Sequence, residues 1–454
     1  MANRNLATWD DKESAKLNEY VQLSLDMWVN DPNGGSHLDN FADLFNETIY
    51  IKILSHKIKF QDIAEIEIKQ QLVKAALRKL KSSGKHGIKN FQNILNQEVE
   101  TYLNWPVDKY YVLCPLNLSQ ESLSRNGSFT VKGVKLLVRD WWYVDKHFSM
   151  NDFITDIEKR FELWGNERPS KENIRRTFMY YFTPIIILAD GRTFTEAFKK
   201  ANEAFHLFRS LLNLSVDTRG SIYRFRTRVP LPQPSGTIWP PSVYAIFNEK
   251  GDYRQFFYNL EKYPDYTSNK IDLKKIIETR KLIGRLSHAT GDQDTLSLMA
   301  EAFAKYGDAL DATEWRLAFL TFWQIFELIT LQSTDESSMG TAIKRVNSLL
   351  AKDQIAQDLL QAVNKTRNDL VHRGQFPENS GEEQVKLIKR LVESVLGAML
   401  FHIKVLKTKG ILRSFYEQVD LVEGSLLNQE RAIKYILRQK QTKRKPSKAK
   451  RPRS

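Results

Sequence analysis

The hydrophobic pattern of the chain changes near its midpoint. In the first half, apolar residues at helical spacing predict helices over residues 17–29, 60–82, 88–103, 151–164 and 193–214. Stretches that are rich in β-branched residues or strongly apolar predict strands over residues 48–54, 110–116, 129–139 and 180–188. Gly133 marks a bulge or a turn, and Pro184 favours an edge position or a bulge. We therefore expect a mixed α and β domain over residues 1–225, of unassigned role as a sensor or substrate selector.

The middle of the chain is rich in proline. Residues 226–242 contain five prolines, which predicts a linker or a long ordered loop. A helix-rich piece is expected to follow up to residue 291, with a basic helix over residues 270–286. We interpret residues 226–291 as a linker and helical connector.

The second half reads as a set of amphipathic helices. They are predicted over residues 295–306, 312–331, 341–350, 353–374, 382–406, 411–420 and 424–438. Short loops between such helices favour an antiparallel bundle, which we place at residues 292–437. The fold class predicted for the whole chain is α+β. The aromatic stripe of Trp315, Phe319, Phe322 and Trp323 is read as bundle core and not as a base-stacking surface.

Composition excludes several classes of protein and site. No run of about 18 apolar residues exists, so we expect no membrane span, and the polar N-terminal segment does not resemble a signal peptide. A single cysteine, Cys114, excludes an internal disulfide and a cysteine-rich zinc site, which favours a cytoplasmic location. The eight histidines are scattered, and no glycine-rich phosphate loop or nucleophile elbow occurs. We therefore expect no metal and no cofactor.

The net charge of +14 is concentrated at the C-terminal end. Residues 438–454 hold nine lysines and arginines and no acid, so the body of the chain is only mildly basic. We predict a disordered tail that adds salt-sensitive affinity for RNA. The residues expected to contact RNA are Lys443, Arg444, Lys445, Lys448, Lys450, Arg451 and Arg453. The alternative is a solvated tail that simply dominates the net charge.

The helix at residues 353–374 carries a polar cluster in its last turns. Asn368 and His372 are four residues apart and lie on one face. Arg367 is five residues before His372, about 140° around an ideal helix. Arginine binds phosphate oxygens in a bidentate fork, and histidine transfers protons near neutral pH. A cation, an amide and an imidazole that converged here could act on a phosphate group.

The cluster Arg367-Asn368-x-x-x-His372 resembles the R-x(4–6)-H signature of HEPN domains, in the R-N-x-x-x-H form. The Val-His-Arg-Gly ending and the upstream helix FWQIFELIT, with Glu327, are similar to the Apea-like branch of that family. The resemblance spans residues 292–406, about a quarter of the chain. It implies a helical bundle that pairs with a second copy.

The resemblance also implies an activity, metal-independent RNA cleavage. The ribose 2′-hydroxyl attacks the adjacent phosphate and leaves a 2′,3′-cyclic phosphate and a 5′-hydroxyl. His372 would be the general acid or base, Arg367 would stabilise the phosphorane, Asn368 would position the phosphate or the histidine, and Glu327 would orient Arg367. Arg373 would be a second phosphate contact or a solvated charge. Homodimerisation would supply the second proton-transfer group. By analogy, the role would be bacterial antiviral defence or a toxin, released by an unidentified phage-derived or nucleotide trigger.

Each of these residues also has a structural interpretation. A histidine at a helix C-terminus is stabilised by the helix dipole, and Glu327 could pair with Arg367 without taking part in any reaction. A second functional hypothesis is a non-catalytic HEPN bundle that serves for dimerisation or nucleotide binding. In that case the N-terminal domain would carry the function, and the basic tail would anchor nucleic acid.

Overall fold

The computed structural model describes most of the chain in segments. These are residues 6–30, 36–38, 50–63, 65–84, 86–116, 127–163, 183–217, 236, 238–241, 243–258, 279–285, 293–331, 339–349, 354–377, 380–402, 409–418 and 423–443. The chain divides into two compact units. Residues 1–109 and 190–197 form the first, and residues 110–189 and 198–454 form the second. The predicted domain boundaries at residues 225, 291 and 437 stay predictions.

The first unit is largely helical. Its elements are β1 (Ala7–Thr8), η1 (Asp11–Glu13), α1 (Ser14–Asp26), β2 (Trp28–Asn30), β3 (Ser36–Leu38), α3 (Lys52–Lys57), β4 (Lys59–Phe60), α4 (Ile66–Ser82) and α5 (Ile88–Asn104). The strands form two small antiparallel pairs, β1 with β4 and β2 with β3. Apolar faces of α1, α4 and α5 form one core, which includes Leu17, Val21, Leu72, Val73, Leu77, Phe91 and Leu95. The three predicted helices of this region are confirmed, although α4 begins later than expected.

The strand predicted at residues 48–54 is wrong, because the described part of that stretch is helical. Residues 50 and 51 belong to a π-helical turn that leads into α3. Ile51, Leu54 and Ile58 are at most 3% exposed and are spaced three and four residues apart. Burying this helical stripe outweighs the weak β preference of the local run of isoleucines.

The corner at residues 190–197 is fixed to α5. The hydroxyl of Tyr102 donates a hydrogen bond of 2.9 Å to Glu196 Oε2, and the backbone N–H of Arg192 donates one of 2.8 Å to the same oxygen. Burial and the contact with Glu196 both raise the pKa of the Tyr102 hydroxyl, so it stays a donor. This buried hydrogen-bonded carboxylate holds the corner in the first unit.

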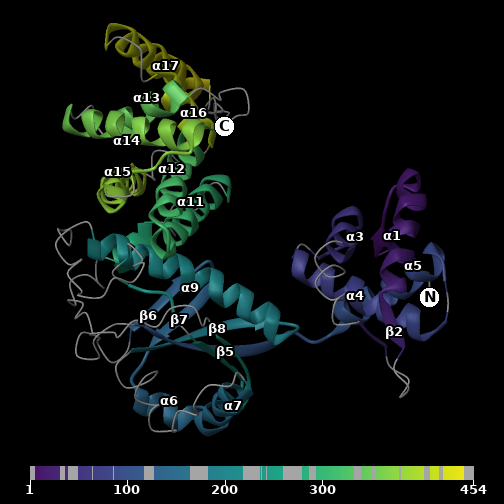
Figure 1. Cartoon of the computed structure of the whole chain (residues 1–454). Helices are drawn as coiled ribbons and strands as arrows, with labels where there is room; N and C mark the ends of the chain where they lie inside the picture. Colours follow the sequence, from purple (N-terminus) through teal and green to yellow (C-terminus); the bar gives the residue numbers. More distant parts are fainter. Residues whose placement is uncertain are drawn as a thin grey trace, which may run out of the picture. The chain divides into compact units, whose positions relative to one another are not determined.

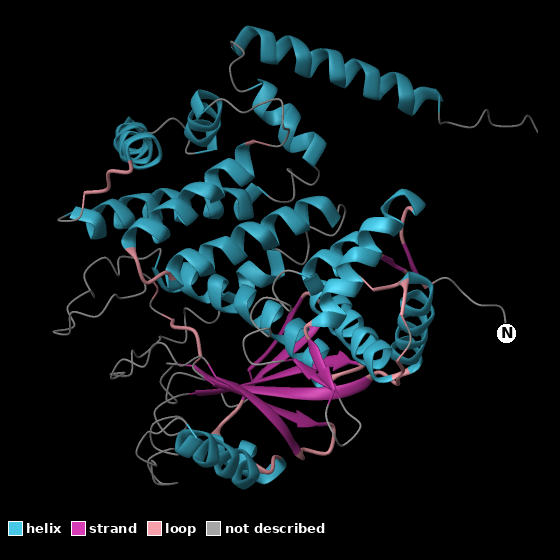
Figure 2. Ribbon diagram, turned by 45° about the vertical axis from the view of Figure 1, so that its right-hand side comes forward, coloured by secondary structure: helices cyan, strands magenta, loops and turns pink. Residues whose placement is uncertain are grey.

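The second unit contains a six-stranded antiparallel sheet. Its strands are β5 (Asp108–Leu116), β6 (Gly127–Val131), β7 (Val134–Val138), β8 (Thr183–Gly191), β9 (Val243–Asn248) and β10 (Tyr253–Tyr258), in the order β10-β9-β5-β8-β7-β6. Helices α6 (Trp141–His147) and α7 (Met150–Leu163) lie on one face, and α9 (Phe194–Asp217) lies on the other (Figures 1 and 2). Both faces of the sheet are covered, which explains the nearly continuous apolar run of β8.

Two turn residues resolve the alternatives at Gly133. The stretch predicted as one strand folds into the hairpin β6–β7, in which Val131 pairs with Val134. Lys132 and Gly133 both have positive φ, at 50° and 78°. This backbone is typical of a type I′ turn, whose twist matches that of the flanking strands. Gly133 is therefore a turn residue.

Pro184 does not lie in an edge strand, which was one of the two predicted alternatives. Strand β8 is an interior strand between β5 and β7. The pairing of β8 with β7 begins at Ile185, opposite Val138, so Pro184 lies one residue before the paired register. A proline at the start of a strand removes no hydrogen bond from that ladder.

The helix-rich piece expected after the proline-rich segment is wrong at residues 243–258. These residues form the hairpin β9–β10, which joins the sheet beside β5. Of the helix expected at residues 270–286, residues 279–285 are helical and residues 270–278 lie outside the described part of the chain.

The C-terminal region is helical, which confirms the α+β class. Its helices are α11 (Gln293–Asp311), α12 (Trp315–Thr330), α13 (Met339–Leu349), α14 (Gln354–Arg373), α15 (Gly381–His402), α16 (Lys409–Gln418) and α17 (Glu423–Lys443). The described side chains of α17 are almost all exposed, so this helix does not share the core of the others. Helix α12 contacts α11, α13 and α15, and α14 contacts α13 and α15. Phe319, Phe322 and Trp323 are buried, so these three residues of the predicted aromatic stripe of α12 are core, whereas Trp315 at the start of the helix is half-buried. None of the described helices is long and apolar enough to cross a membrane.

A buried ion pair joins α9 to α11. The guanidinium of Arg209 is 1% exposed and makes two contacts with the carboxylate of Asp311, of which Nη1 to Oδ1 measures 2.8 Å. Arg209 also donates to the carbonyl of Ile238, and its Nη2 lies 3.3 Å from Nδ1 of His206. His206 in turn lies 3.2 Å from the exposed Asp308. The helix that covers the sheet is thus bonded to the first helix of the C-terminal set.

Candidate functional site

Helix α14 presents the polar cluster in its last two turns. Leu360, Val363 and Leu370 are buried and fix the face that the helix turns to the core. Gly374 has φ of 66°, and its N–H donates to the carbonyl of Leu370 at 3.0 Å. A glycine in the left-handed region ends the helix at the predicted position.

The structure brings Arg367, Asn368 and Glu327 together. Nη2 of Arg367 lies 3.7 Å from Oε1 of Glu327 on α12, and Nη1 donates to Oδ1 of Asn368 at 3.3 Å. The Arg367 side chain is only 18% exposed. Its Nε is buried and has no hydrogen-bond partner in the structure. The guanidinium is therefore positioned by one ion pair and one hydrogen bond, and its buried Nε–H is unused.

The carboxylate of Glu327 is fixed by a second contact, which sequence reasoning did not identify. The indole N–H of Trp323 donates to Oε1 of Glu327 at 3.0 Å. The spacing of four residues on one helix is the signal that could have revealed this pair. Trp323 itself is 2% exposed, so a rigid core residue positions the acid.

His372 stands apart from this group. It lies in the last turn of α14 and is exposed. Within the described part of the chain, no hydrogen bond or ion pair joins it to Arg367, Asn368 or any other side chain. Because α14 remains helical through Arg373, the angular separation between Arg367 and His372 is retained. One copy of the chain thus presents an anchored cation and a separate, accessible imidazole.

The remaining predicted residues contribute less to the site. Arg373 is 70% exposed and pairs with Asp369, one turn earlier, at 3.2 Å. This pairing favours the interpretation of Arg373 as a solvated charge. Of the predicted RNA contacts in the tail, Lys443 is the last residue of α17, and Arg444, Lys445, Lys448, Lys450, Arg451 and Arg453 lie outside the described residues.

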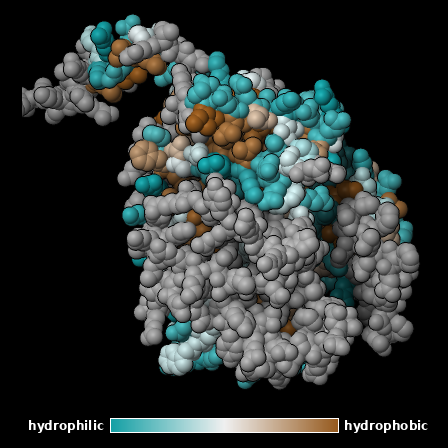
Figure 3. Space-filling model, turned by 60° about the vertical axis from the view of Figure 1, so that its left-hand side comes forward, coloured by the Kyte–Doolittle hydropathy of each residue, from teal (hydrophilic) through white to brown (hydrophobic). Residues whose placement is uncertain are grey.

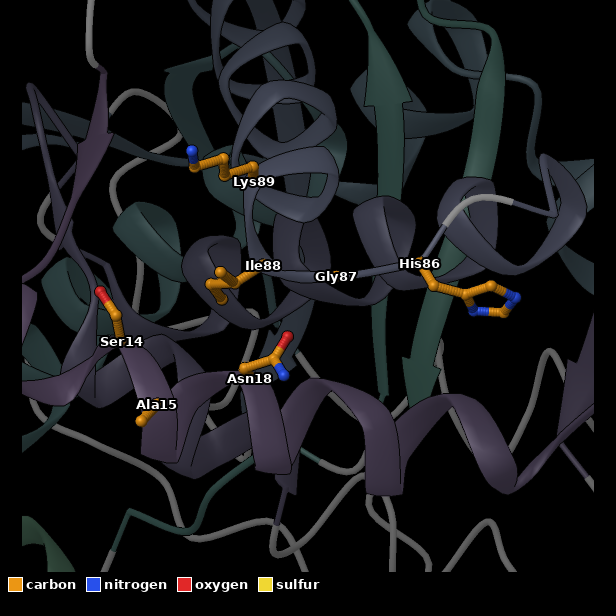
Figure 4. A pocket seen from close by; sticks show the side chains of 7 residues that line it. All are labelled: Ser14, Ala15, Asn18, His86, Gly87, Ile88 and Lys89. Carbon is orange, nitrogen blue, oxygen red and sulfur yellow. The ribbon is translucent and has the colours of Figure 1, made fainter.

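Other locations offer weaker chemistry. A shallow depression of about 520 Å³ in the first unit is lined by Ser14, Ala15, Asn18, His86, Gly87, Ile88 and Lys89. Figure 4 shows the side chains of His86 and Lys89 pointing away from each other, so its charged groups do not converge. No group of three metal-ligating side chains occurs among the described residues. Cys114 is fully buried, and burial raises the pKa of its thiol, which excludes a reactive cysteine there.

No known protein family, curated protein or solved structure matches the chain. The function is therefore inferred from the residues of α12 and α14 themselves.

Proposed function

We propose that the chain is a HEPN-type, metal-independent RNA endonuclease. The observation that carries the proposal is the arrangement around Arg367. Its guanidinium is fixed between Glu327 and Asn368, and the same helix ends in an exposed His372. An arginine held by a neighbouring carboxylate and amide is preorganised to receive the charge of a pentavalent phosphate.

Each residue has one role in the proposed reaction. The ribose 2′-hydroxyl forms a bond to the adjacent phosphorus, and the bond to the 5′-oxygen breaks. His372 accepts the hydroxyl proton or donates one to the departing 5′-oxygen. Arg367 stabilises the phosphorane, and Asn368 positions a phosphate oxygen. Glu327 and Trp323 act as positioning residues through Arg367.

The second proton-transfer group would come from another copy of the chain. The 2′-hydroxyl loses a proton as it attacks, and the departing 5′-oxygen gains one. These are two proton transfers, whereas one motif supplies one histidine. Val371, next to His372, is 50% exposed, so an apolar side chain beside the motif is accessible to a partner. Figure 3 shows a group of apolar side chains on the surface that is bordered by hydrophilic side chains. The proposed homodimer would form through the C-terminal helices.

The proposed activity is tested by incubating the purified protein with RNA in EDTA and mapping the product ends. Cleavage that persists in EDTA and leaves 2′,3′-cyclic phosphate and 5′-hydroxyl ends is the expected result. A requirement for a divalent metal ion, or products with 3′-hydroxyl ends, would refute the mechanism. Addition of lysate from phage-infected bacteria supplies a trigger if one is needed. The proposed biological role is antiviral defence or toxicity in the bacterial cytoplasm.

Glu327→Gln is expected to lower kcat for RNA cleavage roughly two- to fivefold and to leave KM for RNA unchanged. The pair with Arg367 is partly exposed, and such pairs contribute at most about 1 kcal/mol. Glu314→Gln is the matched control, because Glu314 is exposed and makes no side-chain cap at the start of α12. An equal kcat for the two variants would show that Glu327 does not position Arg367.

One observation favours a second candidate function. His372 has no orienting partner among the described residues, whereas an acid–base catalyst is usually held by a second group. A non-catalytic HEPN-like bundle that dimerises or binds nucleic acid would tolerate this arrangement. In that case truncation of the basic tail would abolish the biological effect of the protein, and substitution of His372 would leave it unchanged.

A further inference from the structure

Helix α6 carries a cluster of exposed rings and cations that the proposed reaction does not use. The helix lies on the sheet face opposite α9 (Figure 1), and Trp141 and Val144 anchor it in the core of that face. Trp142, the next residue, is 69% exposed, which is unusual for so large an apolar side chain. Packing against the core therefore does not explain why a tryptophan occupies position 142.

Rings and cations alternate on this surface. Nζ of Lys146 lies 5.0 Å from the centroid of the Trp142 ring. The guanidinium of Arg139 lies 5.4 Å from the ring of Tyr143, whose centroid is 4.3 Å from that of His147. These contacts hold the side chains side by side. The surface thus offers one exposed ring, Trp142, with a lysine against it, whereas Tyr143 is half-buried between the core, Arg139 and His147.

The two acidic residues of the segment are placed differently. The carboxylate of Asp140 accepts a hydrogen bond of 2.9 Å from the backbone N–H of Tyr143, as the N-cap of α6. Asp145 is exposed and lies three residues after Trp142, so it is a neighbour of that ring on the helix surface. The exposed side of α6 therefore carries the Trp142–Lys146 pair with one carboxylate beside it.

We propose that this face of α6 binds single-stranded nucleic acid. An unpaired base stacks on the indole of Trp142, and Lys146 interacts with the adjacent phosphate. Nη1 of Arg139 donates to the backbone carbonyls of Val138 and Gly127, at 2.8 and 3.4 Å, so the fold itself holds this side chain. A flat base joined to an anionic phosphate matches an exposed ring beside a lysine. A purely apolar partner would leave Lys146 without an anion, and a duplex would keep its bases stacked inside. The site is separate from Arg367 and His372 and does not depend on the proposed cleavage.

The inference is tested by the affinity of the full chain for short labelled oligonucleotides at physiological salt. All proteins carry His372→Ala, so that the proposed cleavage cannot consume the RNA. Trp142→Ala is expected to raise the Kd for single-stranded RNA roughly five- to a hundredfold, the usual effect of losing one stacking ring. Trp142→Phe keeps an aromatic face and is expected to retain most of the affinity. Lys146→Ala is expected to reduce the slope of log Kd against log salt by about 0.7, the value for one phosphate contact.

The matched control is Trp105→Ala. Trp105 is 47% exposed at the end of α5 and has no cation against it among the described contacts. Single-stranded RNA and single-stranded DNA are compared, with duplex RNA as a third ligand. Weakened binding of either single strand, with duplex binding unchanged, supports the site, and a loss confined to RNA assigns it to RNA. Unchanged affinity in Trp142→Ala, an equal loss in Trp105→Ala or an equal loss for duplex RNA would overturn it.

Discussion

RNA cleavage in EDTA is expected to fall at least about a hundredfold when His372 is replaced by alanine. A positioned general acid or base accelerates proton transfer by roughly 10²–10⁴. His372 is exposed and forms no ion pair or hydrogen bond within the described residues, so its removal should not unfold α14. The measurement is the single-turnover rate of cleavage, with the product ends mapped for both proteins.

His402→Ala is the matched control for this experiment. His402 is also an exposed histidine, and it lies in the last turn of the neighbouring helix α15. We expect it to keep the wild-type rate and the cyclic-phosphate ends. If both variants cleave RNA as the wild type does, His372 is not catalytic and the non-catalytic bundle becomes the better interpretation. If both lose activity equally, the effect is not specific to the motif.

The largest expected loss of stability is that of Asp311→Ala, at about 3–5 kcal/mol, the usual range for removing one partner of a buried ion pair. Burial acts to lower the pKa of Arg209, but the Asp311 carboxylate outweighs it and keeps the pKa above its ordinary value. Without that carboxylate, a charged guanidinium that is 1% exposed would keep the hydrogen bond to the carbonyl of Ile238 and the contact with His206, but no carboxylate bonded to it among the described residues. The measurement is the denaturant midpoint of the unfolding transition, followed by circular dichroism.

Two variants separate this effect from a general loss of charge. Asp308→Ala removes a carboxylate that is 64% exposed and contacts His206, so it should shift the midpoint little. The double variant Arg209→Met with Asp311→Leu replaces the pair by apolar side chains, which is often close to neutral. Equal midpoints for Asp311→Ala and Asp308→Ala would show that the buried pair does not stabilise the fold.

Long amphipathic helices could be predicted from the sequence because their burial pattern is local. The helices α5, α7, α9 and α14 each repeat apolar residues over several turns, and the structure places them close to the expected bounds. Short elements were harder. Six residues suffice for α3, where the buried Leu54 and the buried cap residues Ile51 and Ile58 override the strand-like composition. In α6, Trp141 and Val144 are the only buried residues of a seven-residue helix, too few to define a period.

Pairing between distant strands could not be read from local pattern. Tyr111 of β5 pairs with Phe247 of β9, and nothing in either segment specifies the other. In the candidate site, too, contacts between residues far apart in the sequence were only partly predictable. The resemblance placed Glu327 beside Arg367, and the ion pair is present. The support from Trp323 and the separation of His372 depend on how α12 and α14 pack, which spacing alone does not determine.

The strand order of the sheet also constrains when the chain can fold during its synthesis. Strands β6, β7 and β8 lie together in the sheet and follow β5 in the sequence, so they can pair soon after Gly191 leaves the ribosome. The exposed side of β5 then stays open until the hairpin that ends at Tyr258 has been made. A nascent chain that stalls before this point would present an unpaired strand edge, which favours aggregation. Ribosome pausing between residues 191 and 258 should therefore lower the yield of folded protein more than pausing after residue 258.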